Sequence, residues 1–347
     1  MGPAALLARS LAVALALFVG AAAARADDVA DFYRGRTITV YVGSGAGGGY
    51  DAYGRLLARH LVRFMPGNPD AVVVNMPGAS SRAAANFLFN KARKDGTVLA
   101  EFQAPIILDP LLYGKNAEGV LYDPLRFGWV GSLDQFTPMV IVWHTAQVRT
   151  IADARGKEIK FGSSGGSVSE RAYANLLNSM LGTKFVAIAG YSGSAEITLA
   201  MERGEIPAFV GWYWAGMKRT KPQWIEQHLV DVLLQLGAKR DPDMGAVPWI
   251  MDVVKDESDR QAWRLVLSNL TLARPFAAPP DTPPERMAAL REAFAKMAAD
   301  KEFRADAEKS LLDIDAASGA EIDATLKAMY ASPEPVVARV RAALDTK

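Results

Sequence analysis

The sequence predicts an α/β protein made of two similar lobes. Strand-like and helix-like segments alternate along the chain with short connections, and this order places helices against a sheet of parallel strands. A strand, a glycine-rich turn and a helix start follow one another at residues 40–55, and the same succession recurs at residues 158–180. Two such units in one chain indicate two α/β lobes that face each other.

The first 26 residues have the pattern of a secretory signal peptide. Arg9 precedes an apolar, alanine-rich run at residues 11–24, and Ala24-Arg25-Ala26 is a small-x-small cleavage signal. The apolar run is short for a bilayer span of about 20 residues, so we interpret it as a cleaved signal and not as a retained anchor. The mature chain would begin at Asp27 and work outside the cytoplasm.

Charge and residue content exclude several functions. The chain carries a formal net charge of +1, and removal of residues 1–26, which hold Arg9 and Arg25, changes it by −2 to −1. A near-neutral chain has no basic field for nucleic acid. There is no cysteine, hence no disulfide and no cysteine-linked lipid, and the three histidines have no metal-ligand spacing. We therefore expect no metal and no cofactor.

The periodicity of apolar residues places elements along both lobes. Residues 37–42 alternate as a strand does, and the following helix has an apolar face and Asp51 as its expected N-cap. Further strands are expected at 71–74, 97–102, 158–161, 185–189, 206–210 and 229–236, and further helices at 80–94, 170–180, 195–203 and 285–298. Thr282 and Pro283 are the expected N-cap and first residue of the helix at 285–298. We expect lobe 1 at 27–137 plus 235–347, and lobe 2 at 138–234.

The first glycine-rich turn favours an anion site. Gly43, Gly45 and Gly48 satisfy the dinucleotide pattern G-x-G-x-x-G, but the second strand ends Val74-Asn75 without the acidic residue that would bind a ribose. The consecutive glycines 47–49 expose backbone N–H groups beside a helix N-terminus, and such groups bind a carboxylate as well as a phosphate. A turn that is rich in glycine only for tight packing stays open as an alternative.

The second turn satisfies the nucleophile pattern G-x-S-x-G with Ser164 at its centre. A hydrolase of that kind needs a histidine after the serine, and only His228 is eligible, in a polar stretch typical of a solvated surface. A polar helix cap is a second alternative. We favour a third interpretation, in which this loop supplies N–H and hydroxyl donors that complement those of the first loop.

Aromatic residues follow the strand expected at 206–210. Trp212, Tyr213 and Trp214 come after an interrupting Gly211, at the end of a parallel strand, where ligand clefts of two-lobed proteins lie. Adjacent positions on a strand alternate between its faces, so Trp212 and Trp214 share one face. The sequence leaves a pocket wall and core packing as open interpretations.

These motifs together resemble the periplasmic solute-binding receptors of tripartite tricarboxylate transporters, also called Bug-type receptors. The resemblance spans nearly the whole mature chain, and its five motifs occur in order at compatible spacing. They are Gly47-Gly48-Gly49-Tyr50-Asp51-Ala52-Tyr53-Gly54-Arg55, Asn75-Met76-Pro77-Gly78-Ala79, Asp95-Gly96-Thr97-Val98-Leu99, Gly162-Ser163-Ser164-Gly165-Gly166-Ser167 and Tyr191-Ser192-Gly193-Ser194.

The resemblance implies a type II periplasmic binding protein, or Venus flytrap, that captures an organic carboxylate in the periplasm and presents it to a membrane permease. It implies no catalysis and a monomer. The carboxylate would be held by two loops, and three aromatic residues would shape the far end of the pocket. The residues so implied are Ser44, Gly45, Ala46, Gly47, Gly48, Gly49, Tyr50, Asp51, Ser163, Ser164, Gly165, Ser167, Tyr191, Trp212 and Trp214.

The chain departs from the family pattern at Gly43, at Ser80-Ser81, at Glu170 and in the aromatic segment at 212–214. These departures concern the identity of the ligand, and the aromatic segment favours an aromatic or bulky acid. Two other functions remain as alternatives, a periplasmic serine hydrolase that uses Ser164 and a carboxylate sensor for a signalling system.

Overall fold

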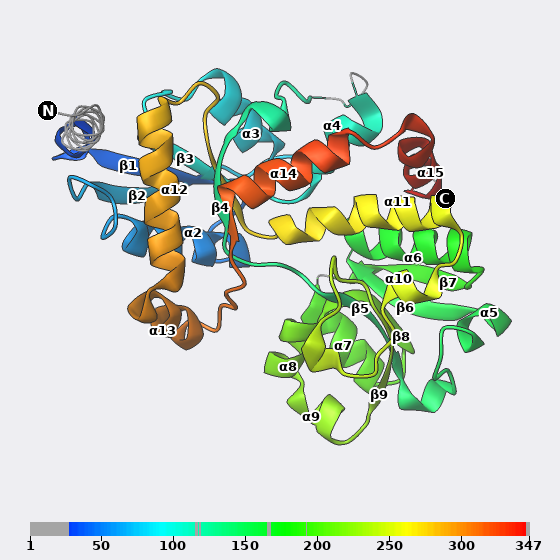
Figure 1. The fold of residues 1–347 in the computed structure, drawn as a ribbon. Coiled ribbons are helices and arrows are strands. Elements are labelled where there is room, and N and C mark those ends of the chain that lie inside the picture. Colours follow the sequence, from blue (N-terminus) through cyan, green and yellow to red (C-terminus); the bar gives the residue numbers. More distant parts are fainter. Residues whose placement is uncertain (1–27, 115–116, 118, 165–167, 192, 345–347) are drawn as a thin grey trace, which may run out of the picture. The chain divides into compact units, whose positions relative to one another are not determined.

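The computed structural model describes residues 28–114, 117, 119–164, 168–191 and 193–344 (Figure 1). The predicted signal peptide, residues 1–26, lies outside these residues. Contacts between residues divide the chain into two units. Unit 1 holds the chain up to Ile106, Gly119–Leu133 and Arg274–Asp323, and unit 2 holds Ile107–Glu118, Asp134–Ala273 and the chain from Ala324 onward.

Unit 1 contains a six-stranded sheet with the order β11-β4-β10-β3-β1-β2. Strand β1 pairs in parallel with both β2 and β3, whereas β10 is antiparallel to β3 and β4, and β11 is antiparallel to β4. The strands are β1 Thr37–Val42, β2 Asp70–Asn75, β3 Val98–Glu101, β4 Gly128–Ser132, β10 Pro275–Ala278 and β11 Ala317–Ser318.

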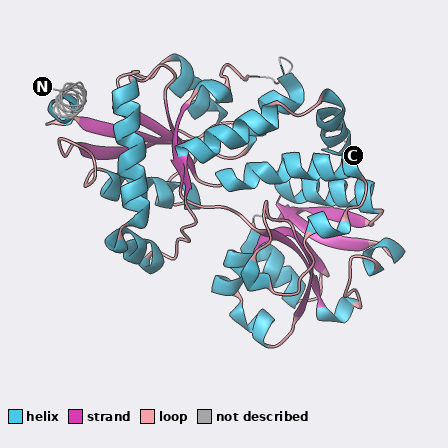
Figure 2. Cartoon of the chain, in the orientation of Figure 1, coloured by secondary structure: helices cyan, strands magenta, loops and turns pink. Residues whose placement is uncertain are grey.

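Helices flank this sheet because each has one apolar face (Figure 2). Helix α2, Gly49–Leu61, buries Leu56, Leu57 and Leu61 in the same core as the strand residues Val40 and Leu99. Helix α12 adds Leu290 and Phe294 to that core. Unit 1 contains the helices α2, α3 Arg82–Asn90, the 3-10 helix η2 Pro124–Arg126, α12 Pro284–Ala299 and α13 Lys301–Lys309, and the boundary between the units falls within α4 Pro105–Tyr113 and within α14 Gly319–Tyr330.

Unit 2 contains a five-stranded sheet with the order β7-β6-β8-β5-β9. Strand β6 pairs in parallel with β7 and β8, and β5 is antiparallel to β8 and β9. The strands are β5 Pro138–Trp143, β6 Ile159–Ser164, β7 Phe185–Tyr191, β8 Ala208–Tyr213 and β9 Val230–Gln235.

One helix of unit 2, α15, comes from a distant part of the chain. Helix α15 packs against both α6 and α11, through the buried side chains of Val336, Val337 and Val340. The helices are η3 His144–Ala146, α5 Asp153–Gly156, α6 Val168–Leu181, α7 Ser194–Glu202, α8 Trp214–Thr220, α9 Pro222–Glu226, η4 Pro242–Met244, α10 Ile250–Val253, α11 Glu257–Ser268, η5 Asn269–Leu272 and α15 Glu334–Leu344.

The α/β class and the strand–loop–helix units are confirmed, but the expectation of purely parallel sheets is wrong. Each sheet contains antiparallel strands that the sequence patterns did not reveal, among them β4, β5 and β10. Strand β10 is only four residues long and fully buried, and so short an apolar run shows no strand periodicity. The contacts also group residues 235–273 and 324–347 with unit 2, whereas the expected lobe 1 included both segments.

Two smaller differences concern helix starts. Helix α12 begins at Pro284 with Pro283 as its N-cap, one residue later than expected, and the Thr282 hydroxyl donates to the carbonyl of Pro279. Helix α3 begins at Arg82 because Ala79, Ser80 and Ser81 have φ values of 45°, 51° and 72°, outside the right-handed helical region. Within the part of the chain that the structure describes, no helix has the length and apolar composition that crossing a membrane requires.

Candidate functional site

One edge of the sheet in unit 1 gathers the predicted binding loop. The carboxyl ends of the parallel strands β1, β2 and β3 meet there, followed by the loop at 43–48, by Asn75 and by Gln103. Strand β10 runs antiparallel to β3, so its first residues lie at the same edge, next to Arg274. Open α/β sheets bind ligands at the carboxyl ends of their strands, and this edge is the candidate site of the unit.

The glycine loop presents exposed backbone at the start of α2. Residues 45–49 are exposed, and Gly48 is the N-cap of α2 with no hydrogen bond from a side chain. The first N–H groups of a helix have no partner inside the helix, and the helix dipole places partial positive charge at the same end. The arrangement matches the anion site that the sequence predicts.

Asp51 holds this loop in place. Its Oδ2 accepts hydrogen bonds from the backbone N–H of Gly47 at 2.9 Å and from Nε of Arg55 at 3.0 Å, and its Oδ1 accepts from Nδ2 of Asn75 at 2.9 Å. The same Asn75 amide donates to the carbonyl of Ser44 at 3.1 Å. The expectation that Asp51 is the N-cap is wrong, because Gly48 has that position and Asp51 lies in the first turn, from which its carboxylate reaches back to the loop.

The hydrogen bonds to Asp51 favour its charged form. The bond from Arg55 is the largest cause that lowers the pKa of Asp51, to about 2, and the bonds from Gly47 and Asn75 act in the same direction against the effect of burial. The Asp51 carboxylate is therefore ionised near neutral pH. Its charge interacts with Arg55 of α2, and its oxygens also accept hydrogen bonds from the loop and from Asn75 of β2.

Ser81 supports the loop from beneath. Its buried hydroxyl donates to the carbonyl of Gly43 at 2.9 Å and accepts from the N–H of Gln103 at 3.0 Å, which links the ends of β1 and β3. A Cβ atom on Gly43 would stand 2.4 Å from the Ser81 hydroxyl oxygen, so only glycine fits there. The packing interpretation of the glycine-rich turn therefore holds for Gly43, whereas the exposed residues 45–49 are not explained by packing.

Arg274 is a residue that the sequence patterns missed. Its guanidinium carbon lies 4.0 Å from the centre of the Tyr50 ring and 4.7 Å from that of Tyr53. One guanidinium nitrogen lies 3.1 Å from the position that a Cβ atom on Gly49 would take. Arg274 is more than 200 residues away from the glycine loop in the sequence, and no local sequence pattern indicates that the two lie side by side.

Glu101 is a second residue that no motif indicated. It is fully buried at the end of β3, and neither of its carboxyl oxygens has a hydrogen-bond partner within the described residues. Burial raises the pKa of Glu101 well above its usual range, with Arg274 lowering it and Asp51 raising it further. Its Oε2 lies 3.0 Å from the position of a Cβ on Gly54, so a glycine in α2 makes room for the carboxyl group.

The sheet of unit 2 brings most of the other predicted residues to one edge. Strands β7, β6 and β8 are parallel neighbours, and Ser164 at the end of β6 pairs with Tyr191 at the end of β7. Ser163 is fully buried, and its hydroxyl has no partner in the described part of the chain. Gly165 and Ser167 lie outside the described residues. Tyr191 is partly buried, and burial raises its pKa.

The two tryptophans at the end of β8 belong to the core of unit 2. Trp212 is 5% exposed, stacks on Phe209 with their ring centres 5.5 Å apart, and meets Trp224 edge to face. Trp214 is 9% exposed and is the first residue of α8. The chain therefore turns from strand to helix between the two tryptophans. Both contribute to the apolar cluster under the sheet edge.

His228 does not approach Ser164. It precedes β9, which is antiparallel to β5, and β5 is in turn antiparallel to β8, the parallel neighbour of β6. The start of β9 is therefore at the opposite end of the sheet from Ser164, about 20 Å away for strands of this length. His144 follows β5 at that same far end. Neither histidine of unit 2 is placed to activate Ser164.

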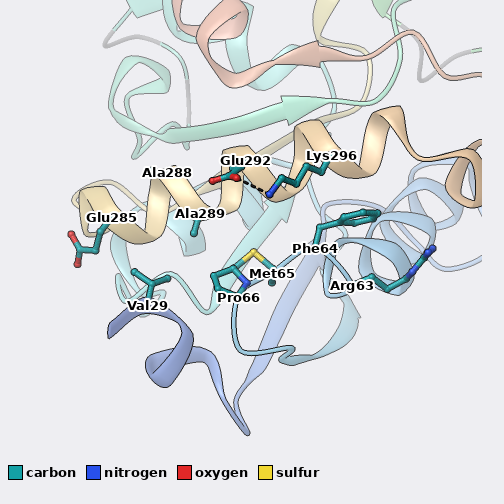
Figure 3. Close-up of a pocket in the computed structure, with 10 residues that line it drawn as sticks. All are labelled: Val29, Arg63, Phe64, Met65, Pro66, Glu285, Ala288, Ala289, Glu292 and Lys296. Carbon is teal, nitrogen blue, oxygen red and sulfur yellow. Dashed lines mark ion pairs between the residues drawn. The ribbon is translucent and has the colours of Figure 1, made fainter. Parts of the chain in front are cut away.

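Two grooves lie away from these edges. The first, in unit 1, has a volume of about 460 Å³ and lies between the segment at 28–33, the chain after α2 and helix α12 (Figure 3). Lys296 and Glu292, one turn apart on α12, form an ion pair at 2.7 Å beside this groove (Figure 3). The second, in unit 2, has a volume of about 730 Å³ beside α6 and β7. Neither contains a predicted binding residue, and the described residues include no cluster of side chains able to hold a metal ion.

Comparison with known proteins places the chain within one class of fold, that of the periplasmic solute-binding proteins. It has a TM-score of 0.68 to a TctC solute-binding protein from Polaromonas, at 21% identity over 90% of this chain and 99% of that one. It has a TM-score of 0.60 to an R. palustris protein solved with adipate, at 21% identity over 88% and 97% of the two chains. It has a TM-score of 0.58 to MatC from Rhodopseudomonas palustris with bound malate, at 17% identity over 89% and 99%.

One curated relative is similar in sequence. The "UPF0065 protein in gbd 5'region" of Cupriavidus necator is 25% identical over 257 residues, which cover 71% of this chain and 73% of that protein. No protein-family model matches the chain. The fold that the resemblance to Bug-type receptors implies is thus confirmed by the solved structures.

Proposed function

We propose that this protein is a periplasmic solute-binding receptor that captures an organic carboxylate for a transporter of the tripartite tricarboxylate type. The observation that carries the proposal is the exposed backbone of Gly45–Gly49 at the N-terminus of α2, tied in place by Asp51. The N–H of Gly47 is bonded to Asp51, and the other backbone donors of this preorganised loop, with a helix dipole behind them, suit an anion and supply no catalytic group.

The structural neighbours support a carboxylate as the anion. Two proteins that share the fold were solved with adipate and with malate. We propose that the loop after β6 supplies further donors to the same ligand, and that a membrane permease receives it. The predicted signal peptide and the periplasmic neighbours support a location in the periplasm.

The position of the histidines counts against the serine hydrolase. His228 and His144 stand at the end of the sheet opposite Ser164, so neither histidine of this unit reaches that serine. A sensor that passes its signal to a membrane kinase would need the same binding site, and no observation on this chain favours it over the receptor.

A thermal-shift screen with organic acids tests the receptor. A ligand that binds the folded chain stabilises it by RT ln(1 + [L]/Kd), about 2.7 kcal/mol at a hundredfold excess over Kd. We expect at least one member of a panel of acetate, malate, adipate and benzoate to raise the melting temperature. If benzoate is the strongest member, the preference for an aromatic acid is supported. If no acid raises the melting temperature, the receptor proposal fails.

A pair of variants at Gly49 tests the loop itself. Gly49 is the first residue of α2 and follows an extended Gly48, a setting that accepts proline without a change in backbone. Gly49→Pro deletes one N–H group, whereas Gly49→Ala adds a similar Cβ and keeps it. We expect the proline variant to bind the acid about tenfold more weakly than the alanine variant, the value of one hydrogen bond to a charged group. Equal affinities would remove the N–H groups of this loop from the site.

A further inference from the structure

Arg274 is fixed at the same sheet edge as the glycine loop. Its backbone N–H donates to the Ser132 hydroxyl at 3.1 Å, and its carbonyl accepts from the N–H of Leu133 at 3.1 Å, so the residue is tied to β4. Its side chain then lies against the Tyr50 and Tyr53 rings, with their centres 4.0 and 4.7 Å from the guanidinium carbon. An arginine held against two aromatic faces loses little further freedom when it binds an anion.

The guanidinium also lies beside the N-terminus of α2. One of its nitrogens stands 3.1 Å from the Cβ position of Gly49, the residue that begins the helix. A planar guanidinium offers paired donors that match a carboxylate, and the helix terminus offers backbone donors at the same place. The two kinds of donor therefore converge on one region of unit 1.

Glu101 is a buried carboxyl group on which the Arg274 charge acts. Glu101 is near enough for the Arg274 charge to act on it, yet its two oxygens make no hydrogen bond with any described residue. Burial is the larger effect and favours the neutral form of Glu101. The neutral form of Glu101 carries no charge that would repel an anion at this edge.

We propose that Arg274 is the charged anchor of the anion site, and that its guanidinium binds the ligand carboxylate beside the first turn of α2. This inference rests on the proposed function and makes it more specific. Asp51 and Arg55 form an ion pair with each other, whereas the Arg274 guanidinium lies against two aromatic rings beside the first turn of α2. The edge therefore fits a single carboxylate group, and any second acidic group of the ligand is bound elsewhere.

Calorimetric titration of the full chain with acetate, malate, adipate and benzoate tests the anchor. Arg274→Gln removes the charge and is expected to weaken binding of the acids by about 10- to 100-fold, the range for a charge-assisted hydrogen bond. Arg274→Lys keeps the charge without the paired donors and is expected to recover part of that loss. Raising the salt concentration is expected to weaken acid binding by the wild-type chain more than acid binding by Arg274→Gln, because the variant lacks the charge that salt screens.

Arg286→Gln is the matched control. Arg286 is also half-buried in unit 1, with its guanidinium carbon 3.5 Å from the centre of the Phe32 ring, but it donates to the carbonyl of Asp95 away from the loop. We expect it to bind the acids like the wild-type chain. If Arg274→Gln does not fold, the comparison of Arg274→Lys with the wild type decides the question, and an unchanged affinity overturns the anchor.

The outcomes separate this inference from the proposed function. If the wild-type chain and Arg274→Gln bind an acid with equal affinity, the proposed role of Arg274 is overturned and the proposed receptor function stands. Absence of binding by the wild-type chain to all four acids overturns both.

Discussion

At the scale of single residues, Asp51 shows how one side chain organises a loop of glycines. Glycines alone do not hold a loop in one conformation, because they lose more backbone entropy on folding than other residues. Asp51 offsets this cost by accepting hydrogen bonds from Gly47, Arg55 and Asn75, which belong to the loop, to α2 and to β2. The donors that would meet a ligand are therefore ordered before it arrives.

Replacement of Asp51 by asparagine is expected to lower stability in a way that depends on pH. The folded-state pKa of about 2 lies below the ordinary value of 3.8 for an aspartate, so the charged form stabilises the fold by about 2 kcal/mol above pH 4. This contribution is lost as the pH falls from about 4 to about 2. Urea unfolding at pH 7 and at pH 2.5 measures it, and the difference between wild type and Asp51→Asn is expected to shrink at the lower pH.

The exposed Asp70 at the start of β2 provides the control. Asp70→Asn makes the same chemical change without a hydrogen-bond network, and we expect it to change stability by less than about 0.5 kcal/mol. A difference between wild type and Asp51→Asn that stays constant between pH 7 and 2.5 would contradict the role assigned to the Asp51 carboxylate.

At the scale of elements, helix α2 lies close to the sheet because Gly54 faces it. A Cβ atom on Gly54 would stand 2.5 Å from a methyl group of Val42 and 3.0 Å from Oε2 of Glu101. The same helix carries the proposed anion site at its first turn and the core residues Leu56 and Leu57 on its buried face. The position of the site therefore depends on the distance between this helix and β1.

Gly54→Ala is expected to move α2 away from the sheet and to lower stability by about 1–3 kcal/mol, the usual cost of overpacking a core. Chemical denaturation measures the change, and titration with the acid panel is expected to show weaker binding as well. Gly156→Ala is the control, because a Cβ atom there meets nothing within 4 Å in α5. If Gly54→Ala has the stability of the wild type, the close approach of α2 does not constrain the site.

At the scale of the whole molecule, the chain passes between its two units several times. Helix α15 comes from the end of the described chain, yet it belongs to unit 2, where it packs against α6 and α11. Arg339 on α15 makes two contacts with the buried Asp259 of α11, from Nε at 2.9 Å and from Nη2 at 2.8 Å. A late segment of the chain thus packs against α6, the helix that follows the loop after β6.

Val340→Ala tests the importance of this late segment. Val340 is fully buried, and its truncation is expected to lower stability by about 1–3 kcal/mol through lost apolar burial and a small cavity. Val72→Ala is the control, because Val72 is 47% exposed on β2 and its truncation removes little burial. Urea unfolding measures both variants. Equal stability of the two would show that α15 adds little to unit 2.

Local patterns predicted much of the fold. Strand β1 was predicted with its observed ends, Thr37 and Val42, because β-branched residues alternate there and a glycine turn follows. Helix α2 was predicted from its apolar spacing. Strand β10 and its antiparallel pairing were missed, since four buried residues show no periodicity and pairing partners are far away in the sequence.

The candidate site divides in the same way. The sequence by itself determined that the glycine-rich residues 45–49 lie at the N-terminus of a helix, because that depends only on neighbouring residues. Only the tertiary structure decided that Arg274 lies against Tyr50, that Glu101 is buried beneath α2 and that His228 is far from Ser164. These relations join residues that are distant in the chain. The order and direction of the strands bring such residues together or keep them apart, and local sequence patterns reveal neither.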